Sequence, residues 1–227
     1  MNPRTVPDAH AYVPPPDLGL EVLHLEPAFV VLVKPPGLLS EPGRGPDKRD
    51  SLLVRALAMY PDARIVHRLD MMTSGVIVLA RETRAHATLS EAFREREVDK
   101  TYEALVHGRP ERDEGEIDLP LVVDWPNRPR QVVCHATGKP SLTHYRVIGD
   151  ALVDGVGTLT RVSLAPVTGR THQLRVHLAS LGCPIAGDPF YGIGGDTAPR
   201  MMLHACRLDF AHPQTGEPLS FASAVPF

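Results

Sequence analysis

Residues 63–80 read ARIVHRLDMMTSGVIVLA. Two apolar runs, 63–69 and 76–80, flank Asp70 and a short MMTSG segment, and their content of Ile, Val and Leu predicts two strands joined by a turn. A carboxylate at the end of an apolar strand, followed by small polar residues and a glycine, is well placed at a cleft to act as nucleophile or base. Aspartate is also a common turn residue. Taken alone, these residues favour the turn role for Asp70 over a chemical one.

The segments around this stretch predict a single α+β domain with a largely antiparallel or mixed sheet. Apolar periodicity predicts a helix at 52–60 with its cap at Asp50-Ser51, and a longer helix at 84–97 capped by Thr83. Further strands are expected at 30–33, 101–106, 142–148 and 158–165, and a last helix from 168–169 to 181. Residues 1–20 contain five prolines and no periodicity, so we expect an arm there and the domain proper over 21–227.

The composition excludes several classes of protein. The chain has 227 residues, 43% of them hydrophobic and 22% charged, which is ordinary for a globular protein. Its apolar runs are too short to span a bilayer, and its N-terminus has no apolar core typical of a signal peptide. The three isolated cysteines do not suggest a disulfide framework. We therefore expect a cytoplasmic protein with no membrane partner.

The net charge of −3 conceals an uneven distribution of charge along the chain. Residues 111–124 carry six acidic side chains and one basic one, whereas residues 125–177 carry seven basic side chains and two acidic ones. The second segment is long enough to follow a phosphate backbone, so it is a candidate RNA-binding region. Charge blocks of this kind also mark ordinary solvated surfaces, and charge alone does not decide between the two.

A second candidate site lies in VTGRTHQLRVH, residues 167–177. Arg170 is expected in the first helical turn, where the helix dipole disfavours a cation unless a carboxylate or phosphate compensates. A solvated arginine at a frayed helix end is the alternative. His172 and His177 are five residues apart and do not share a helical face, so we expect no metal site. Tyr102 is either a stacking surface for a base or, more commonly for a strand tyrosine, a core residue.

Five short stretches, in the same order along the chain, resemble the RluA family of pseudouridine synthases. The central one is HRLDMMTSGVIVLA (67–80), and the others are VLVKPPGLLS (31–40), KTYEALVHG (100–108), VTGRTHQLRVHLASLGCPIAGDPFYG (167–192) and LHACRLDF (203–210). The resemblance covers nearly the whole chain from about residue 20. It implies a pseudouridine synthase catalytic domain over 21–227, with a largely antiparallel mixed sheet flanked by helices. Many members of the family also carry an N-terminal S4 RNA-binding domain, and we expect none here, since only the proline-rich residues 1–20 precede the catalytic region.

The resemblance also implies roles for particular residues. Asp70 is then the catalytic aspartate, Tyr102 lies against the target base and Arg170 pairs with the aspartate. Leu174 lines the pocket, and Arg68 helps hold the flipped-out nucleotide or fill the space that it leaves. The expected partner is RNA, gripped by the catalytic domain itself. Neither a cofactor nor a metal is expected, and we expect a monomer.

Within the family, DWPNRPRQVV (124–133) and FREREVDKTYEALV (93–106) are similar to the RluA subgroup, which implies large-subunit ribosomal RNA, tRNA anticodon stem-loops or both as substrates. Two alternative hypotheses assign the chain to other functional classes. An inert RNA-binding or ribosome-assembly protein of the same fold would need none of Asp70, Tyr102 and Arg170. A glycosidase or nucleosidase generally needs two carboxylates, whereas the motifs here offer one.

Overall fold

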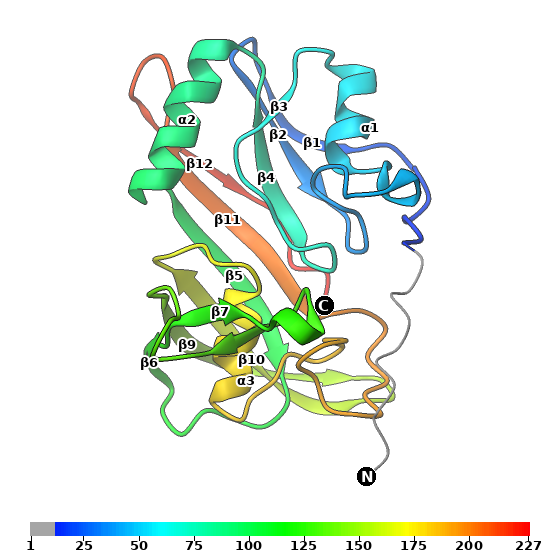
Figure 1. Cartoon of the computed structure of the whole chain (residues 1–227), viewed down its shortest axis with the longest axis vertical. Helices are drawn as coiled ribbons and strands as arrows, with labels where there is room; N and C mark the ends of the chain where they lie inside the picture. The colour runs from blue at the N-terminus through cyan, green and yellow to red at the C-terminus, as the bar shows by residue number, and fades with distance from the viewer. Residues whose placement is uncertain (1–11) are drawn as a thin grey trace.

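The computed structural model describes residues 12–227 and consists mainly of one mixed sheet (Figure 1). Ten strands form this sheet in the order β1-β2-β4-β11-β5-β10-β9-β6, with β12 added beside β11 and β3 beside β4. Among these strands every pairing is antiparallel except that of β4 with β11. The α+β fold with a largely antiparallel mixed sheet is therefore confirmed. The strands are β1 (Glu21–Leu25), β2 (Phe29–Lys34), β3 (Arg64–Ile65), β4 (Ser74–Ala80), β5 (Asp99–Val106), β6 (Glu114–Asp118), β9 (Leu142–Val153), β10 (Gly157–Pro166), β11 (Leu203–Ala211) and β12 (Pro218–Ala222).

The sheet divides the molecule into two halves that share β5 and β11 (Figure 1). One half holds β1, β2 and β4 with helices α1 (Leu52–Met59) and α2 (Thr83–Glu95). The other holds β6, β9 and β10 with helix α3 (Gln173–Ser180) and a separate hairpin of β7 (Leu121–Val123) and β8 (Gln131–Val133). Two one-turn 3-10 helices complete the elements, η1 (Pro46–Lys48) and η2 (Trp125–Asn127).

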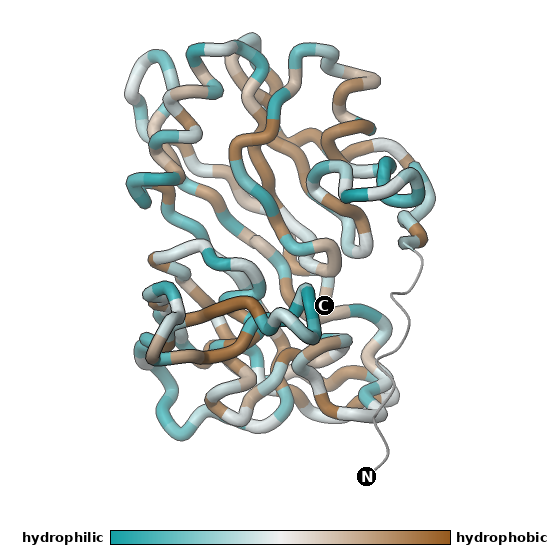
Figure 2. Tube along the Cα trace, in the orientation of Figure 1, coloured by the Kyte–Doolittle hydropathy of each residue, from teal (hydrophilic) through white to brown (hydrophobic). Residues whose placement is uncertain are grey.

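Strands β2 and β4 are apolar along their length because both faces of the sheet are covered here (Figure 2). Val31 and Val78 pack with Leu89 of α2 on one face. Val30 and Ile77, which point to the opposite face, pack with the apolar side of α1. A third cluster of buried side chains lies between α3 and strands β5, β10 and β11. Successive residues of β2 and β4 point to opposite faces of the sheet, so each strand contributes to two separate hydrophobic cores.

The helix predictions are confirmed in part. Helix α1 begins after Ser51, whose side chain accepts a hydrogen bond from the Val54 N–H, as expected for an N-cap. The predicted Thr83 cap of α2 is wrong, because Glu82 occupies the cap position and the Thr83 hydroxyl instead accepts from Arg64. The start predicted for α3 at 168–169 is also wrong, since the helix begins at Gln173.

The turn that precedes α3 explains its late start. The Gln173 side-chain oxygen accepts hydrogen bonds from the Arg170 N–H (3.0 Å) and the Thr168 hydroxyl (2.7 Å). His172 then adopts the left-handed backbone conformation, with φ of 54°. Arg170 therefore lies in a turn before the helix and not in its first turn. The side-chain bonds take the place of the helical hydrogen bonds that this segment would otherwise make.

The predicted strand 63–69 is found only at β3, because the chain leaves the sheet after Ile65. His67 replaces the missing strand at β4, and its Nε2 accepts the Val78 N–H at 3.1 Å. Gly75 then allows β4 to approach β11. Its φ is 119°, and a Cβ there would lie 2.2 Å from the Ala205 carbonyl oxygen. The segment 66–73, which carries Asp70, is thus fixed at both ends.

Most of the predicted arm, residues 1–11, lies outside the described residues. Residues 12–20 form no helix or strand and pack beside α1. The Tyr12 hydroxyl accepts the Leu39 N–H at 3.0 Å, and Arg55 donates to the Pro15 and Pro16 carbonyls. Within residues 12–227, none of the helices has the length and apolar character to cross a bilayer.

Candidate active site

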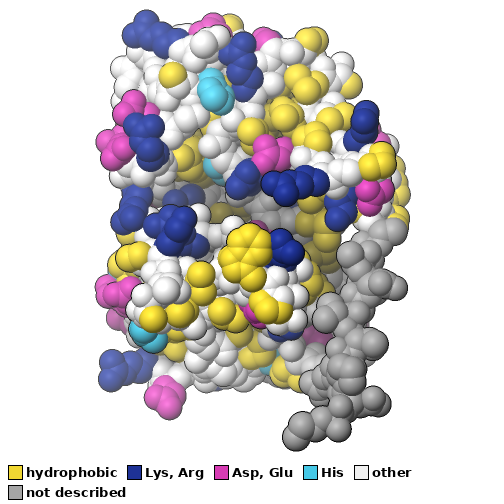
Figure 3. Space-filling model, in the orientation of Figure 1, with side chains coloured by type: hydrophobic (Ala, Val, Ile, Leu, Met, Phe, Trp, Pro, Cys, Tyr) yellow, Lys and Arg dark blue, Asp and Glu magenta, His cyan; other side chains and the backbone are white. Residues whose placement is uncertain are grey.

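A cleft of about 790 Å³ lies where the two halves meet. Its walls come from residues 39–43, the segment 65–70, the end of α2, strand β5 and the segment 166–175. Figure 3 shows Lys and Arg side chains on both sides of the hollow across the middle of the molecule. The basic side chains of the lining are Arg68, Arg94, Arg96, Lys100, Arg170 and Arg175, and the acidic ones are Glu41 and Asp70.

Asp70 projects into this cleft from the segment between β3 and β4. Its carbonyl accepts the Thr73 N–H at 3.1 Å, which closes a turn directly after it. The side chain is 24% exposed, and its Oδ2 accepts a hydrogen bond from Arg175 Nη1 at 3.3 Å. Asp70 therefore both begins a turn and presents a carboxylate to the cleft, so the two readings left open by its sequence context are compatible.

Arg175 is held on α3 by a second carboxylate. Its Nε and Nη2 donate to the two oxygens of Asp188 at 2.7 and 2.8 Å, in the paired geometry that only a guanidinium offers. Asp188 also accepts the N–H groups of Phe190 and Tyr191 at 2.8 and 3.1 Å. Burial acts to raise the pKa of Asp188, but Arg175 and these N–H groups outweigh it and keep that pKa below its usual value. The remaining guanidinium nitrogen, Nη1, is the one that donates to Asp70.

The structure does not bring Arg170, the expected partner of Asp70, to that carboxylate; Arg175 lies there instead. Arg170 is exposed at the rim of the cleft, and its Nε lies 3.4 Å from the Pro140 carbonyl oxygen. Because it precedes α3 in a turn, its side chain does not share the inward direction of Arg175, which is 2% exposed. Every residue from Gln173 to Leu178 is buried, so α3 is covered on all sides and the periodicity of its sequence did not single out Arg175.

The other three predicted site residues also line the cleft. Tyr102 lies on β5, and burial, reinforced by the charge of Asp70, raises the pKa of its phenol far above the usual value. Leu174 is 7% exposed and contributes apolar surface. Arg68 is exposed and donates to Glu41 Oε1 at 2.6 Å. The structure brings Asp70, Tyr102 and Leu174 into one cleft with Arg68 at its rim, whereas the roles implied for them stay predictions.

Two further groups near Asp70 were not predicted from the sequence to belong to this site. Lys34 is fully buried and donates to the carbonyls of Pro35, Leu38 and Met71 at 2.9, 2.7 and 3.0 Å, which fixes the residue next to Asp70. Burial lowers the pKa of Lys34 to about 7, against the opposing charge of Asp70. A lysine at the end of an otherwise apolar strand was the available signal.

His172 is the second such group, and it lines the cleft wall. Its Nδ1 lies 2.9 Å from the Tyr191 hydroxyl. Burial lowers the pKa of His172 to about 4, again against the charge of Asp70. The imidazole is therefore neutral at physiological pH, which leaves Arg175 as the cation in contact with Asp70.

The predicted continuous basic region over 125–177 is divided by the fold. Arg146 pairs with Glu114 at 3.3 Å and Arg161 with Glu103 at 3.1 Å, so these two charges are already compensated. Four of the cleft's cations come instead from outside this stretch, namely Arg68, Arg94, Arg96 and Lys100. Two of these four are also paired within the protein, Arg68 with Glu41 and Arg94 with Glu91 and Glu95, so RNA phosphates would have to compete with these glutamates. The basic surface is assembled from separate segments, which a count along the chain does not reveal.

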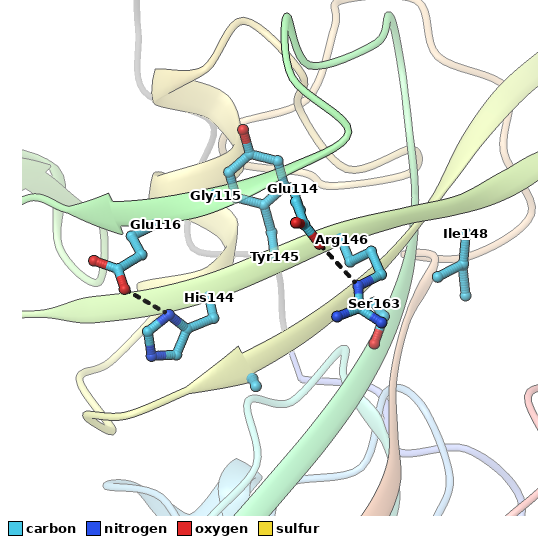
Figure 4. A pocket seen from close by; sticks show the side chains of 9 residues that line it. Glu114, Gly115, Glu116, His144, Tyr145, Arg146, Ile148 and Ser163 are labelled. Atoms are coloured by element: carbon cyan, nitrogen blue, oxygen red, sulfur yellow. Dashed lines mark ion pairs between the residues drawn. The ribbon is translucent and has the colours of Figure 1, made fainter.

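A second, open depression of about 520 Å³ lies over β6, β9 and β10 (Figure 4). Its two ion pairs, Glu116 with His144 (3.2 Å) and Glu114 with Arg146 (3.3 Å), join residues directly opposite each other in the β6–β9 register. Such exposed cross-strand pairs contribute little stability and form no catalytic arrangement. Figure 4 shows the Tyr145 ring on the other side of the strand. Within residues 12–227, no three His, Cys, Asp or Glu side chains are grouped so that they could hold a metal ion.

Comparison with known proteins connects the cleft to a family. The family model of RNA pseudouridylate synthases matches residues 28–180, a range that contains Asp70, Tyr102 and Arg175. The dual-specificity RNA pseudouridine synthase RluA of Escherichia coli strain K12 is 47% identical over 218 residues, covering 95% of this chain and 98% of that protein. The enzyme of the same name from Yersinia pestis is 50% identical over 208 residues, covering 91% and 99%.

Solved structures agree with this result. The human RNA pseudouridylate synthase domain containing 1 superposes with a TM-score of 0.79 at 30% identity, covering 95% of this chain and 87% of that one. The human RNA pseudouridylate synthase domain containing 4 superposes with a TM-score of 0.70 at 28% identity, covering 91% and 88%.

Proposed function

The chain belongs to the RNA pseudouridylate synthase family, and on this premise we propose that it isomerises uridines in large-subunit ribosomal RNA and in tRNA anticodon stem-loops. Its relatives from Escherichia coli and Yersinia pestis are dual-specificity RNA pseudouridine synthases, which supports more than one class of RNA substrate. The observation that carries the proposal is the pairing of Asp70 with Arg175 inside a cleft rimmed by basic side chains.

The reaction requires little beyond a carboxylate and a closed pocket. The N1–C1′ bond of uridine breaks, the uracil turns and C5 bonds to C1′; C5 then loses its proton and N1 gains one, so atoms balance with no change of oxidation state. The uracil must leave its stack to enter the cleft, at a cost of a few kcal/mol. Asp70 then acts in its ionised form, either by attacking the sugar or base or by removing the 2′-proton. In both routes, Arg175 fixes the orientation of the carboxylate.

The surrounding side chains suit a free uracil. Tyr102 offers a flat ring, and its raised phenol pKa keeps the hydroxyl protonated and able to donate a hydrogen bond. Leu174 supplies an apolar wall. Arg68, exposed at the rim, is in a position to occupy the space that the flipped nucleotide leaves. These assignments make Asp70 and Tyr102 catalytic residues, and Arg68 and Leu174 substrate-binding ones.

Arg170 takes a different part from the one first expected of it. Its exposed side chain at the cleft rim is suited to a phosphate contact. Glu41, the other acidic residue of the lining, is engaged by Arg68, so a pair of free carboxylates as in a glycosidase is not offered. We propose further that residues 21–227 are the catalytic domain, residues 1–20 an arm, and the protein a cytoplasmic monomer.

Total RNA from cells that lack this protein, incubated with the purified protein, tests the proposal. We expect new pseudouridines at defined positions in large-subunit ribosomal RNA and in tRNA anticodon loops, mapped at nucleotide resolution. The Asp70→Asn variant, purified in the same way, is the control. New sites in neither RNA class would overturn the proposed function, and sites in one class alone would reduce the dual specificity to that class.

A further inference from the structure

Trp125 is the most conspicuous side chain outside the cleft. It is the single tryptophan of the chain, it lies in η2 between β7 and β8, and it is 64% exposed. The Arg128 guanidinium lies over its ring, 4.7 Å from the centroid. An exposed apolar residue alone needs no explanation, but an exposed indole with a cation stacked on it is a recurrent way to bind a base together with its phosphate.

The turn that carries Trp125 is held in a fixed shape. The Asp124 N–H donates to the Arg130 carbonyl at 2.9 Å, and the Arg130 N–H donates to the Asn127 carbonyl at 3.1 Å. The Asp124 carboxylate accepts from the Asn127 amide at 2.8 Å, so this nearby acid is engaged within the turn. The indole is therefore presented on a turn that is already ordered, which lowers the entropic cost of stacking on it.

The same turn is fastened to the wall of the cleft. The Gln131 N–H donates to the Tyr191 hydroxyl at 2.7 Å, and that hydroxyl also contacts His172, which lines the cleft. Arg130 donates to the Phe190 carbonyl and lies over the Tyr191 ring. In Figure 1 the hairpin of β7 and β8 ends in η2 near the middle of the molecule. An RNA strand that leaves the cleft along this wall would therefore reach the β7–β8 hairpin.

From these contacts we infer that Trp125 and Arg128 form a stacking platform for an unpaired base of the RNA, next to the part of the RNA that enters the cleft. The inference rests on the proposed function and adds a physical basis on which the enzyme selects its RNA substrate. Arg128, Arg130 and Lys139 are exposed around the hairpin and suit a polyanion. A base within a duplex is already stacked on both faces, whereas a loop base is free to stack on an aromatic ring. The platform therefore selects RNA that is single-stranded beside the target uridine.

Because Trp125 is the single tryptophan of the chain, the tryptophan fluorescence of the protein reports on this position alone. The Asp70→Asn variant, which prevents turnover, is titrated with a synthetic stem-loop RNA with a seven-nucleotide loop, and separately with the same strand annealed to its complement. Binding is followed in parallel by the anisotropy of a fluorescent label on the RNA. We expect the stem-loop to quench the tryptophan emission as it saturates the protein, and the duplex to bind without quenching. Saturation by the stem-loop with unchanged emission would overturn the platform.

Variants separate stacking from a structural role. For Trp125→Ala we expect the stem-loop dissociation constant to rise about ten- to a hundredfold, the range that loss of one base–aromatic stack gives. Trp125→Phe should recover most of the affinity, and the duplex affinity should not change. Leu152→Ala, another exposed apolar side chain at 79% exposure, is the matched control and should bind as the wild type does.

Single-turnover kinetics with otherwise wild-type protein complete the test. Trp125→Ala should raise the RNA concentration that gives half the maximal rate and leave the maximal rate itself unchanged. A lower maximal rate with unaltered affinity would contradict the inference. Quenching by the stem-loop without any pseudouridine product would instead remove the proposed function and leave the platform standing.

Discussion

At the scale of single residues, Arg175 determines the geometry of the candidate site. It donates to Asp188 with two nitrogens and to Asp70 with a third, so that one guanidinium connects a structural carboxylate to a chemical one. The Asp188 pair sets the direction of the guanidinium plane, and the third nitrogen then meets Asp70. A lysine has the same charge but a single nitrogen, and it cannot make both contacts in a fixed plane.

We therefore predict different results for lysine at the two arginines. Arg175→Lys should lower the single-turnover rate of pseudouridine formation about ten- to a hundredfold, which corresponds to about 1.4–2.8 kcal/mol at 1.4 kcal/mol per tenfold. Arg170→Lys keeps an exposed charge at the rim and should stay within a few-fold of the wild type. Both rates are measured at saturating RNA, and thermal unfolding shows whether Arg175→Lys is folded. The opposite order of effects would mean that Arg170, and not Arg175, is the partner of Asp70 when RNA is bound.

The family resemblance of five stretches in order predicted that Asp70, Tyr102, Leu174 and Arg68 share one site, and all four line one cleft. Taken alone, the residues favoured a turn role for Asp70 and a core role for Tyr102. The sequence did not allow prediction of which arginine faces Asp70. That choice depends on where α3 begins, and the side chain of Gln173 moves the start by several residues. The role of Asp188 as the partner of Arg175 could not be predicted either, because only folding brings Asp188 next to α3.

At the scale of elements, the long apolar strands were predictable and the short polar ones were not. β2 and β4 bury both faces, so their sequences are continuous apolar runs. β6, with the sequence EGEID, lies at the edge of the sheet and exposes most of its side chains. Its pairing depends on partners in β9, such as Arg146 opposite Glu114, which no local pattern reveals.

His67 substitutes for a strand at β4, and this predicts sensitivity to acid. Its Nε2 accepts the Val78 N–H, its ring stacks on Phe93 with 4.2 Å between centroids, and burial lowers its pKa to about 3. Protonation would remove the acceptor. Because the pKa of His67 is lower in the folded than in the unfolded protein, its stabilising effect is complete above pH 6.5 and declines as the pH falls towards 3.

We expect the free energy of unfolding, measured with urea, to show this decline. Between pH 7.5 and pH 5.0 the wild type should lose about 2 kcal/mol more than His67→Gln, because each pH unit below 6.5 costs about 1.4 kcal/mol for one such group. The glutamine carbonyl retains an acceptor for Val78 but does not titrate. Equal losses in the two proteins would show that His67 does not titrate in this way.

At the scale of the whole molecule, the acidic net charge does not describe the surface that RNA would meet. The chain carries −3 overall, yet the rim of the cleft gathers Arg68, Arg94, Arg96 and Arg170 from three separate segments. Exposed cations that converge on one groove attract a polyanion whatever the total charge. The total charge is therefore a poor guide to the partner of this protein.

Affinity for a stem-loop RNA should consequently fall steeply with salt. If the four rim arginines each contact a phosphate, the logarithm of the association constant should fall against the logarithm of salt concentration with a slope of about −3, at about −0.7 per contact for single strands. Arg96→Ala should make the slope shallower by about 0.7. Arg84→Ala, which removes an exposed charge near the opposite end of α2, should leave the slope unchanged. A wild-type slope near zero would exclude the rim from RNA binding.

The account as a whole depends on the Asp70 carboxylate. Asp70→Asn keeps the size of the side chain and its place beside Arg175 but removes the charge, while the phosphate contacts that dominate affinity are untouched. The most direct measurement is pseudouridine yield in a single turnover at saturating RNA, with the dissociation constant determined by filter binding in the same preparation. We predict no product above background and an affinity within a few-fold of the wild type. Appreciable turnover by Asp70→Asn would contradict the central claim.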